Sequence, residues 1–155
     1  MIGFRDATAA DLPVIVALLA DDALGRSREN PATPLPDCYR RGFEAMLDQG
    51  GVIILALDGD ADGAPVVGCL QLNLLHGVSQ RGQCRAQVEG VRVASSRRGT
   101  GAGTALMAEA IRRAREAGAG LMQLTTNLSR ADARRFYERL GFQHTHAGMK
   151  RTLDR

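Results

Sequence analysis

The spacing of apolar residues in the first quarter of the chain predicts two helices separated by a long loop. Apolar side chains recur every three or four positions over residues 12–19, directly after the N-cap signal of Thr8, and again over 39–47. Between them, over 21–36, the pattern dissolves into glycine, serine, asparagine and three prolines. We expect this loop to line a substrate site, as long loops between helices often do.

Runs of apolar residues elsewhere in the first half predict strands. A short extended segment around Phe4 is expected to open the fold, before the first helix. The continuous apolar run over 52–57 and the segment over 65–75 predict two further strands. The turn residues over 58–63 would join these two strands as an antiparallel hairpin.

The second half predicts a strand-helix-strand crossover and a final hairpin. The expected elements are a strand over 85–94, a helix whose apolar face runs over 106–117 with Gly118 as its C-cap, a strand over 121–126, a helix over 131–140 and a hairpin over 142–153. The order of elements predicts an α/β (α+β) sandwich, with a mixed, largely antiparallel twisted sheet and helices on both faces.

Composition limits the class of protein. The 155 residues are 45% hydrophobic and 24% charged, which is typical of one globular domain over residues 1–155. No apolar run approaches the roughly 20 residues that cross a bilayer, so no membrane partner is expected. The first residues lack the charged-then-apolar order of a secretory signal, and we therefore expect a cytoplasmic protein.

No residue pattern suggests a metal site. The three cysteines are scattered, and His144 and His146 have no further ligands at a suitable spacing. Asp58 begins an alternation of aspartates like that of a calcium loop, but Cys69 stands where the closing glutamate would be required. We expect no metal.

The net charge of +3 conceals two halves of opposite sign. Up to Val91 there are 7 arginines and lysines against 12 acidic residues, and from Arg92 onward 13 against 5. A basic half suits a phosphorylated ligand, although an arginine-rich helix face exposed to solvent explains the same count.

Three glycines in five residues, between Gly99 and Gly103, stand at the start of a predicted helix. Backbone amides at a helix N-terminus attract anions, and glycine removes the Cβ that would obstruct them. A Walker loop would require Lys-Ser/Thr after Gly103, and a dinucleotide loop would require glycine at Thr104. Neither nucleotide loop fits.

The pattern that does fit is [Arg/Gln]-x-x-Gly-x-[Gly/Ala], formed by Arg98, Gly101 and Gly103. Downstream, residues 124–127 and 133–142 end in Phe-Tyr-x-x-x-Gly-Phe. With these two segments the sequence resembles the GNAT superfamily of N-acetyltransferases over residues 89–142. The resemblance implies a GNAT-like fold, acetyl-coenzyme A (acetyl-CoA) as donor, and one N-acetyltransferase domain.

The resemblance also implies how the donor is held. The main chain of Val91 and Val93 would pair with the pantetheine arm, and the amides of residues 98–104 would hold the pyrophosphate. Arg97 is either a further phosphate contact or an exposed loop residue, and Asn127 either a cofactor contact or a turn former. The residues assigned to cofactor binding are Val91, Arg92, Val93, Arg98, Gly99, Thr100, Gly101, Ala102, Gly103, Thr104, Asn127, Ala133 and Phe136.

Amide formation needs a base for the amine and an acid for the departing thiolate, and Glu89 and Tyr137 are the candidates. In a regular strand Glu89 would share a face with apolar Val91 and Val93, and partial desolvation would increase its affinity for a proton. For Glu89 the alternatives are a carboxylate with a purely structural role, or a proton relay through water in place of a direct base. Gly90 suggests a β-bulge. Tyr137 matches the tyrosine that protonates the departing thiolate in the family. Alternatively, it is an amphipathic core residue whose hydroxyl lies at the edge of the core.

Three functions are compatible with the sequence. The first is an acetyl-CoA-dependent N-acetyltransferase that acts by direct attack of a small amine, which Asp21, Asp22 and Glu29 in the long loop would attract. The second is a sensor or interaction module that binds acyl-CoA without turnover. Nucleic-acid binding is the third, and we expect no such partner because only six aromatic residues are present and no stacking motif is found. A homodimer is possible.

Overall fold

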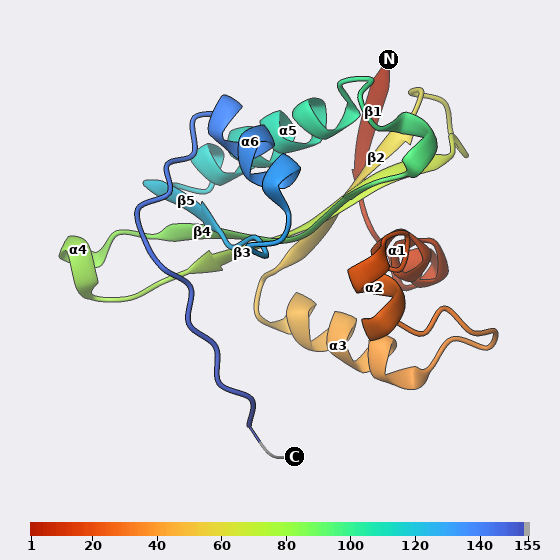
Figure 1. Cartoon of the computed structure of the whole chain (residues 1–155), viewed down its shortest axis with the longest axis horizontal. Coiled ribbons are helices and arrows are strands. Elements are labelled where there is room, and N and C mark those ends of the chain that lie inside the picture. Colours follow the sequence, from red (N-terminus) through yellow and green to blue (C-terminus); the bar gives the residue numbers. More distant parts are fainter. Residues whose placement is uncertain (154–155) are drawn as a thin grey trace.

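The computed structural model describes residues 1–153 as a five-stranded sheet with helices packed on both faces (Figure 1). The strands follow one another in space as they do in sequence: β1 (Ile2–Asp6), β2 (Val52–Asp58), β3 (Val66–Leu75), β4 (Arg85–Val93) and β5 (Leu121–Leu124). The first four are antiparallel neighbours, whereas β5 is parallel to β4. The predicted fold class is confirmed.

Helices form two layers. The helical elements in chain order are η1 (Ala9–Asp11), α1 (Leu12–Leu19), α2 (Ala23–Arg28), α3 (Asp37–Asp48), α4 (Ser79–Gly82), η2 (Ser95–Arg97), α5 (Ala102–Glu116) and α6 (Ala131–Arg139). Figure 1 shows α5 and α6 on one face of the sheet and α1 to α3 on the other. A parallel pair of neighbouring strands needs a crossover connection, and α5 supplies it between β4 and β5. None of the helices within residues 1–153 combines the length and apolar character that a membrane crossing requires.

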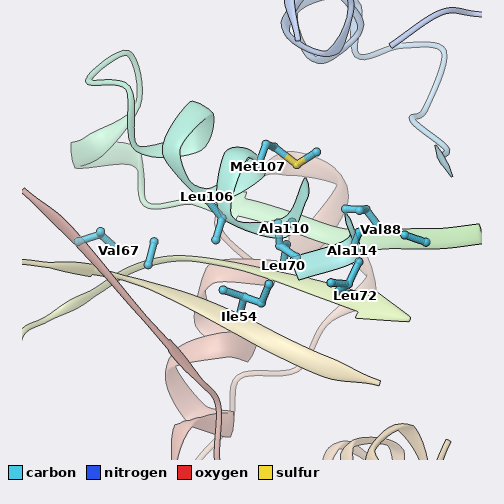
Figure 2. Packing of buried hydrophobic residues seen from close by; sticks show 11 residues of the cluster. Ile54, Val67, Leu70, Leu72, Val88, Leu106, Met107, Ala110 and Ala114 are labelled. Atoms are coloured by element: carbon cyan, nitrogen blue, oxygen red, sulfur yellow. The ribbon is translucent and has the colours of Figure 1, made fainter. Parts of the chain in front are cut away.

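The buried core follows the alternation of side chains along β2 and β3. Ile54 and Leu70 point toward α5, where they meet Leu106 and Met107 in the cluster of Figure 2. Leu55 and its neighbours point to the other face and pack against α1. Because β2 is covered on both faces, its sequence is continuously apolar instead of alternating, as the run over 52–57 predicted.

One predicted loop contains a helix. Residues 21–36 were expected to be irregular, but 23–28 form α2. The Asp22 side chain caps this helix by accepting a hydrogen bond from the Gly25 amide at 2.6 Å. Gly25 is there because the chain passes so close to α1 that a Cβ would lie 1.9 Å from the Leu19 carbonyl oxygen. The glycine that suggested a loop is therefore a packing residue within a helix.

The predicted final hairpin is wrong. Residues 143–153 contain no strand, and all of them are exposed. Only Phe142, at the start of the predicted hairpin, is half-buried, and it packs against Tyr137 at a ring distance of 5.9 Å. The polar and apolar residues of this segment do not alternate, and none of its residues belongs to the five strands of the sheet.

Candidate functional site

The parallel strands β4 and β5 separate halfway along β4, and a cleft opens between them. Their pairing extends from Arg85 with Leu121 to Val88 with Leu124, after which β4 continues to Val93 with no partner on that side among residues 1–153. The cleft has a volume of about 510 Å³. Its lining residues are Asp22, Val91, Arg92, Val93, Arg98, Ser129, Arg130, Ala131, Asp132, Ala133 and Arg135.

A β-bulge at Gly90 lies at the point where the strands separate. Glu89 pairs with Gln71 and Arg92 with Cys69, so that two residues of β4 face one residue of β3. Gly90 has φ +60°, a left-handed conformation that glycine adopts without strain. The bulge that Gly90 predicted is confirmed.

The bulge corrects the prediction that Glu89 shares a face with Val91 and Val93. The side chains of Val88 and Val91 both pack into the core beneath α5, although an odd number of positions separates them. Glu89 therefore points to the opposite face from Val91. It is exposed and accepts a hydrogen bond from Gln87 Nε2 at 3.0 Å, so the apolar surroundings expected for it do not exist.

The backbone of β4 beyond the bulge presents hydrogen-bonding groups to the cleft. The Ala94 amide donates to the Val67 carbonyl of β3 at 2.8 Å, and successive residues of a strand direct these groups to opposite sides. The backbone groups of Val91 and Val93 therefore face the cleft. Two arginines reach their carbonyls: Arg98 Nε donates to Val93 at 3.1 Å and Arg92 Nη1 donates to Val91 at 2.8 Å.

The three glycines of the loop differ in their conformation and in their surroundings. Gly99 and Gly101 have φ of +75° and +89°, and a Cβ on either would meet nothing within 4 Å. They are required for backbone conformation and leave the approach to the first turn of α5 open. Gly103 instead lies at the contact with α6, where a Cβ would lie 3.4 Å from Phe136 Cζ, at the short end of ordinary van der Waals contact. Residues 99–101 thus provide the open helix N-terminus that an anion requires.

Neighbouring arginines of the loop have different partners. Arg97 Nη2 lies 2.8 Å from Asp58 Oδ1, which ties the loop to the β2–β3 turn, and Arg97 is not among the lining residues of the cleft. Arg98 does line the cleft and lies 3.2 Å from the carboxylate of Asp21. Of the two, only Arg98 is placed to reach a ligand in the cleft.

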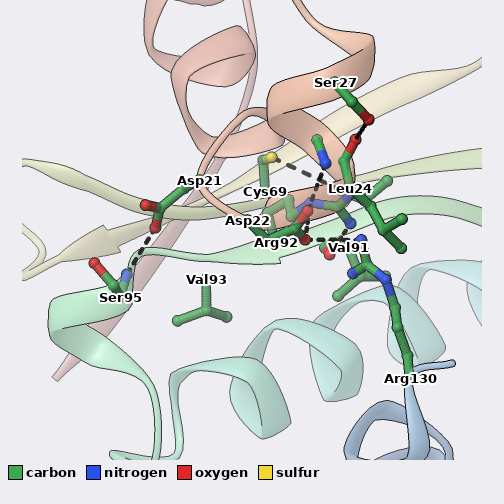
Figure 3. A network of polar contacts seen from close by, with 12 residues as sticks. Asp21, Asp22, Leu24, Ser27, Cys69, Val91, Arg92, Val93, Ser95 and Arg130 are labelled. Carbon is green, nitrogen blue, oxygen red and sulfur yellow. Dashed lines mark hydrogen bonds and ion pairs between the residues drawn. The ribbon is translucent and has the colours of Figure 1, made fainter.

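Asp22 joins both sides of the cleft (Figure 3). Its Oδ2 lies 2.7 Å from Arg130 Nη2 and 3.8 Å from Arg92 Nε. Burial by itself would raise the pKa of Asp22, but the Gly25 amide and the two guanidinium groups outweigh burial and lower it. Asp22 is therefore an ionised carboxylate between two cations, one from β4 and one from the start of α6.

The acidic residues of the long loop are all engaged within the protein. Asp21 accepts from the Ser95 amide at 3.1 Å, beside its contact with Arg98 (Figure 3). Glu29 accepts from the Tyr39 hydroxyl at 2.9 Å. Asp21 and Asp22 thus stabilise the arginines of the cleft, which was not expected from the sequence, and none of the three acids is left without a partner to attract a cationic amine.

Tyr137 lies on α6 one helical turn after Ala133, which lines the cleft, but Tyr137 is not itself among the lining residues. It is half-buried, and its ring contacts Phe136 edge-on at 5.2 Å. Burial raises the pKa of its hydroxyl, an effect that the positive charges of Arg92 and Arg130 partly oppose. The phenol is consequently protonated at neutral pH and can act as a proton donor.

Asn127 forms a turn at the mouth of the cleft. Its Oδ1 accepts hydrogen bonds from the Ser129 amide at 2.9 Å and from the Ser129 hydroxyl at 2.7 Å. This turn places Ser129 and Arg130 on the cleft wall, followed by Ala133 one helical turn later. Sequence reasoning assigned Asn127 and Ala133, missed Ser129 and Arg130, and gave Asp22 a different role, that of attracting the amine.

Nothing among residues 1–153 resembles a metal centre, since no three histidine, cysteine or acidic side chains gather closely enough to hold an ion. The cleft instead fits the donor that the sequence motifs imply. An open helix N-terminus and arginine side chains suit phosphate groups, and a free strand edge suits the amides of a pantetheine arm.

Comparison with known proteins decides the family. Residues 18–142 match the model of the Acetyltransferase (GNAT) family, which is well over half of the chain. The protein belongs to the GNAT family of acetyltransferases. The resemblance inferred from Arg98 to Gly103 and from residues 124–142 is thereby confirmed, and this GNAT protein is an acetyl-CoA-dependent N-acetyltransferase.

Individual relatives extend over the whole GNAT chain. An aminoalkylphosphonate N-acetyltransferase of Salmonella typhimurium is 33% identical over 153 residues, which are 96% of this chain and 90% of that protein. A solved structure from Bacillus halodurans, described as a transcriptional regulator, is 43% identical with a TM-score of 0.91 and covers 99% of this chain and 100% of its own. A predicted acetyltransferase from Clostridium acetobutylicum, solved with acetyl-CoA, shares the fold at 15% identity, a TM-score of 0.74 and coverage of 98% and 96%.

Proposed function

We propose that the protein transfers the acetyl group of acetyl-CoA to the primary amine of a small acceptor by direct attack of the amine on the thioester. The observation that carries the proposal is the separation of β4 and β5 at Gly90. It leaves the backbone of Val91 and Val93 facing one cleft with Arg98, which directly precedes the open start of α5, and with Ala133, which lies one helical turn before Tyr137 on α6.

Binding of the donor uses three parts of the cleft. Acetyl-CoA supplies the activated acetyl group as a thioester when it is bound. The backbone of Val91 and Val93 holds the pantetheine arm by extending the strand edge. The amides at the start of α5 hold the pyrophosphate, and Arg98 adds a charge-assisted hydrogen bond from the side of the loop.

Transfer then moves two protons. The amine nitrogen forms a bond to the carbonyl carbon while the carbon–sulfur bond breaks. Glu89 accepts the proton that the amine loses, and because its side chain is exposed, a water molecule is the intermediary that suits this position. Tyr137 donates its hydroxyl proton to the departing sulfur and regains it from solvent.

For the acceptor, we propose a small amine that carries an anionic group such as a phosphonate. The full-length likeness to the Salmonella aminoalkylphosphonate N-acetyltransferase supports this class. The last turn of α2 also carries Arg26 and Arg28, which are exposed and form no ion pair with a carboxylate among residues 1–153. Since the acids of the preceding loop are already neutralised, this side of the protein favours an anion over a polycation.

The test is a thiol-release assay with acetyl-CoA and three matched acceptors: an aminoalkylphosphonate, the corresponding amino acid and an uncharged alkylamine. We expect fastest turnover with the phosphonate, and mass spectrometry should find the acetyl group on nitrogen. The double variant Arg26→Gln with Arg28→Gln should raise the KM for the phosphonate about tenfold, a loss of roughly 1.4 kcal/mol that is typical of charge-assisted hydrogen bonds. Arg40→Gln, on α3, is the matched control.

Two results would contradict different parts of the proposal. Turnover of all three amines at equal rates would remove the anionic acceptor but leave the N-acetyltransferase. Acetyl-CoA binding with no thiol release for any amine would remove the catalytic proposal and favour a module that binds acyl-CoA without turnover.

A further inference from the structure

One face of β3, β4 and β5 carries a row of amide side chains. On each of these strands, alternate residues pack into the core beneath α5, among them Leu72, Val88 and Leu124. Because side chains alternate along a strand, the residues next to them lie on the opposite face. These neighbours include four half-buried amides and one exposed carboxylate: Gln71, Asn73, Gln87, Gln123 and Glu89. The proposed base therefore belongs to a polar row that crosses the strands.

Two of these amides form a chain of hydrogen bonds that ends on Glu89. Gln123 Nε2 donates to Gln87 Oε1 at 2.7 Å, and Gln87 Nε2 donates to Glu89 Oε1 at 3.0 Å. The sheet fixes this arrangement, because Gln87 lies directly opposite Gln123 in the parallel pairing and two residues before Glu89 on β4. Among residues 1–153, Gln87 is the only side chain that forms a hydrogen bond with the Glu89 carboxylate.

The chain has a direction, because the two ends of an amide group differ. An ionised carboxylate only accepts hydrogen bonds, so it requires the NH₂ end of Gln87 and not its oxygen. Gln123 donates to the oxygen of Gln87, which holds that oxygen toward β5 and leaves the NH₂ end toward Glu89. Without the Gln123 donor, Gln87 could turn its oxygen toward the carboxylate, where the two acceptors would repel each other. Gln123 therefore acts on Glu89 through Gln87.

The position of Glu89 makes such support necessary. Glu89 directly precedes the bulge at Gly90 and follows Val88, the last residue of β4 that pairs with β5. Its side chain is exposed and flexible, so that in water it would occupy several rotamers. A general base contributes only when it lies within hydrogen-bond reach of the proton that it accepts, directly or through one water molecule. The bond from Gln87 to Oε1 selects among these rotamers and leaves Oε2 to receive the proton.

We propose that Gln87 and Gln123 are positioning residues for the proton transfer to Glu89, an inference that rests on the base named in the proposed function. The amine nitrogen gives its proton to the intervening water molecule, which passes one of its own protons to Glu89 Oε2, and this proton then returns to solvent. Gln87 donates to Oε1 throughout, so the carboxyl group keeps its orientation in both protonation states. Neither amide lines the cleft, so both act through Glu89.

The test replaces each glutamine by methionine, which keeps nearly the same length and shape but has no amide. Thiol release with acetyl-CoA and an aminoalkylphosphonate gives kcat and KM. We expect Gln87→Met to lower kcat about tenfold, a usual effect of losing a hydrogen bond to a charged group, and Gln123→Met about threefold, because Gln87 remains. The KM values for both substrates should change less than about twofold, since neither amide contacts them in the proposal.

Asn73→Leu is the matched control. It removes a hydrogen bond from Gln71 Nε2 at 2.6 Å on the same face of the sheet, but Asn73 is not part of the chain to Glu89. This variant should leave kcat unchanged. Far-ultraviolet circular dichroism verifies the folding of every variant, and if Gln87→Met does not fold, Gln123→Met takes its place in all comparisons.

A double-variant cycle distinguishes failure of this inference from failure of the proposed function. Glu89→Gln alone should lower kcat about 100-fold, and adding Gln87→Met should lower it less than about twofold further, because the positioned group is already gone. An unchanged kcat in Glu89→Gln would remove the base itself, and the positioning role with it.

Three other results would overturn the positioning role alone, provided that Glu89→Gln does lower kcat. The first is an unchanged kcat in Gln87→Met. The second is the same tenfold loss from Gln87→Met with and without Glu89→Gln, which would show that the amide does not act through the carboxylate. The third is a raised KM for the phosphonate at constant kcat, which would make the amides a contact for the acceptor.

Discussion

The two halves of the molecule differ in how their important contacts relate to sequence. In the half formed by β4, α5, β5 and α6, the contacts around the cleft come from local conformation: a bulge at Gly90, left-handed glycines at 99 and 101, and a turn at Asn127. In the half formed by α1 to α3, they come from side chains distant in sequence, such as Asp21 with Arg98 and Asp22 with Arg130. Local conformational requirements leave a motif in a sequence, whereas a distant ion pair leaves only two ordinary residues.

The chain's two tyrosines, one in each half, give the largest contrast. Tyr137→Phe removes the proposed acid, and we expect kcat to fall about 100-fold or more, the usual scale of general acid catalysis, with acetyl-CoA affinity nearly unchanged. Tyr39→Phe removes a hydroxyl that donates to Glu29 and accepts from the Asn30 amide, and it should change kcat by less than about threefold. Steady-state thiol release measures both, and equal rates for the two variants would exclude Tyr137 as the acid.

Substitution of two glycines at opposite ends of α5 distinguishes the effect of backbone strain on stability from an effect on ligand binding. Gly101 and Gly118 have φ of +89° and +80°, and both have open space around the missing Cβ. Changing either to alanine should cost about 1 kcal/mol of unfolding free energy, measured by urea denaturation. Only Gly101→Ala should also weaken acetyl-CoA binding, by about 30-fold in calorimetry, since it distorts the amides that hold the pyrophosphate. Equal affinities in the two variants would place the pyrophosphate elsewhere.

Adjacent arginines test the orientation of the loop. Arg98→Met should weaken acetyl-CoA binding about tenfold, because it removes a charge-assisted hydrogen bond to the pyrophosphate. The contacts that Arg98 makes in the free protein offset only part of this loss. Arg97→Met should change the affinity less than about twofold, since this side chain is bound to Asp58 outside the cleft. Titrations at low and high salt measure both, and a larger loss for Arg97→Met would reverse the assignment.

The smallest effect concerns the pH dependence of stability in the α1 half. The Arg5 guanidinium, together with the Thr8 amide and hydroxyl, lowers the pKa of Asp11 from 3.8 to about 2. Because the folded pKa lies below the ordinary value, the ionised carboxylate stabilises the fold above about pH 4, and this contribution is lost as the pH falls toward 2. We expect Asp11→Asn to cost about 1 kcal/mol at pH 7 and progressively less below pH 4.

The control for this prediction is Asp37→Asn. Asp37 pairs with Arg41 on the surface of α3, where both side chains are about two-thirds exposed. The loss should stay below about 0.5 kcal/mol at any pH, as is usual for exposed pairs. Denaturant unfolding at pH 7 and pH 3 measures both variants. An Asp11→Asn loss that is the same at the two pH values would show that the carboxylate charge is not the source.

The helices, the strands and the cleft wall of β4 were largely predictable from sequence because periodicity and glycine conformation are local properties. The face of Glu89 was not, since a single extra residue at Gly90 reverses the alternation on which the prediction depended. The helix α2, which Asp22 caps, was not predicted because Gly25 was taken as a sign of a loop, whereas it is a buried packing residue. The hairpin predicted over 142–153 rested on its place after Gly141 and not on a regular alternation, and only Phe142 of it is held in the fold, against Tyr137.

Gly103 belongs both to the glycine motif at the start of α5 and to the contact between α5 and α6. A Cβ at this position would lie 3.4 Å from Phe136 Cζ, at the short end of ordinary van der Waals contact, and Phe136 is the neighbour of Tyr137 on α6. The same glycine lies in the first turn of α5, where the donor is proposed to be held. A side chain larger than that of alanine at this position would therefore press on Phe136 and on the helix that carries the proposed proton donor. An engineer who wishes to enlarge this enzyme's range of acyl donors cannot treat donor recognition and proton delivery as independent modules, because both share one contact between α5 and α6.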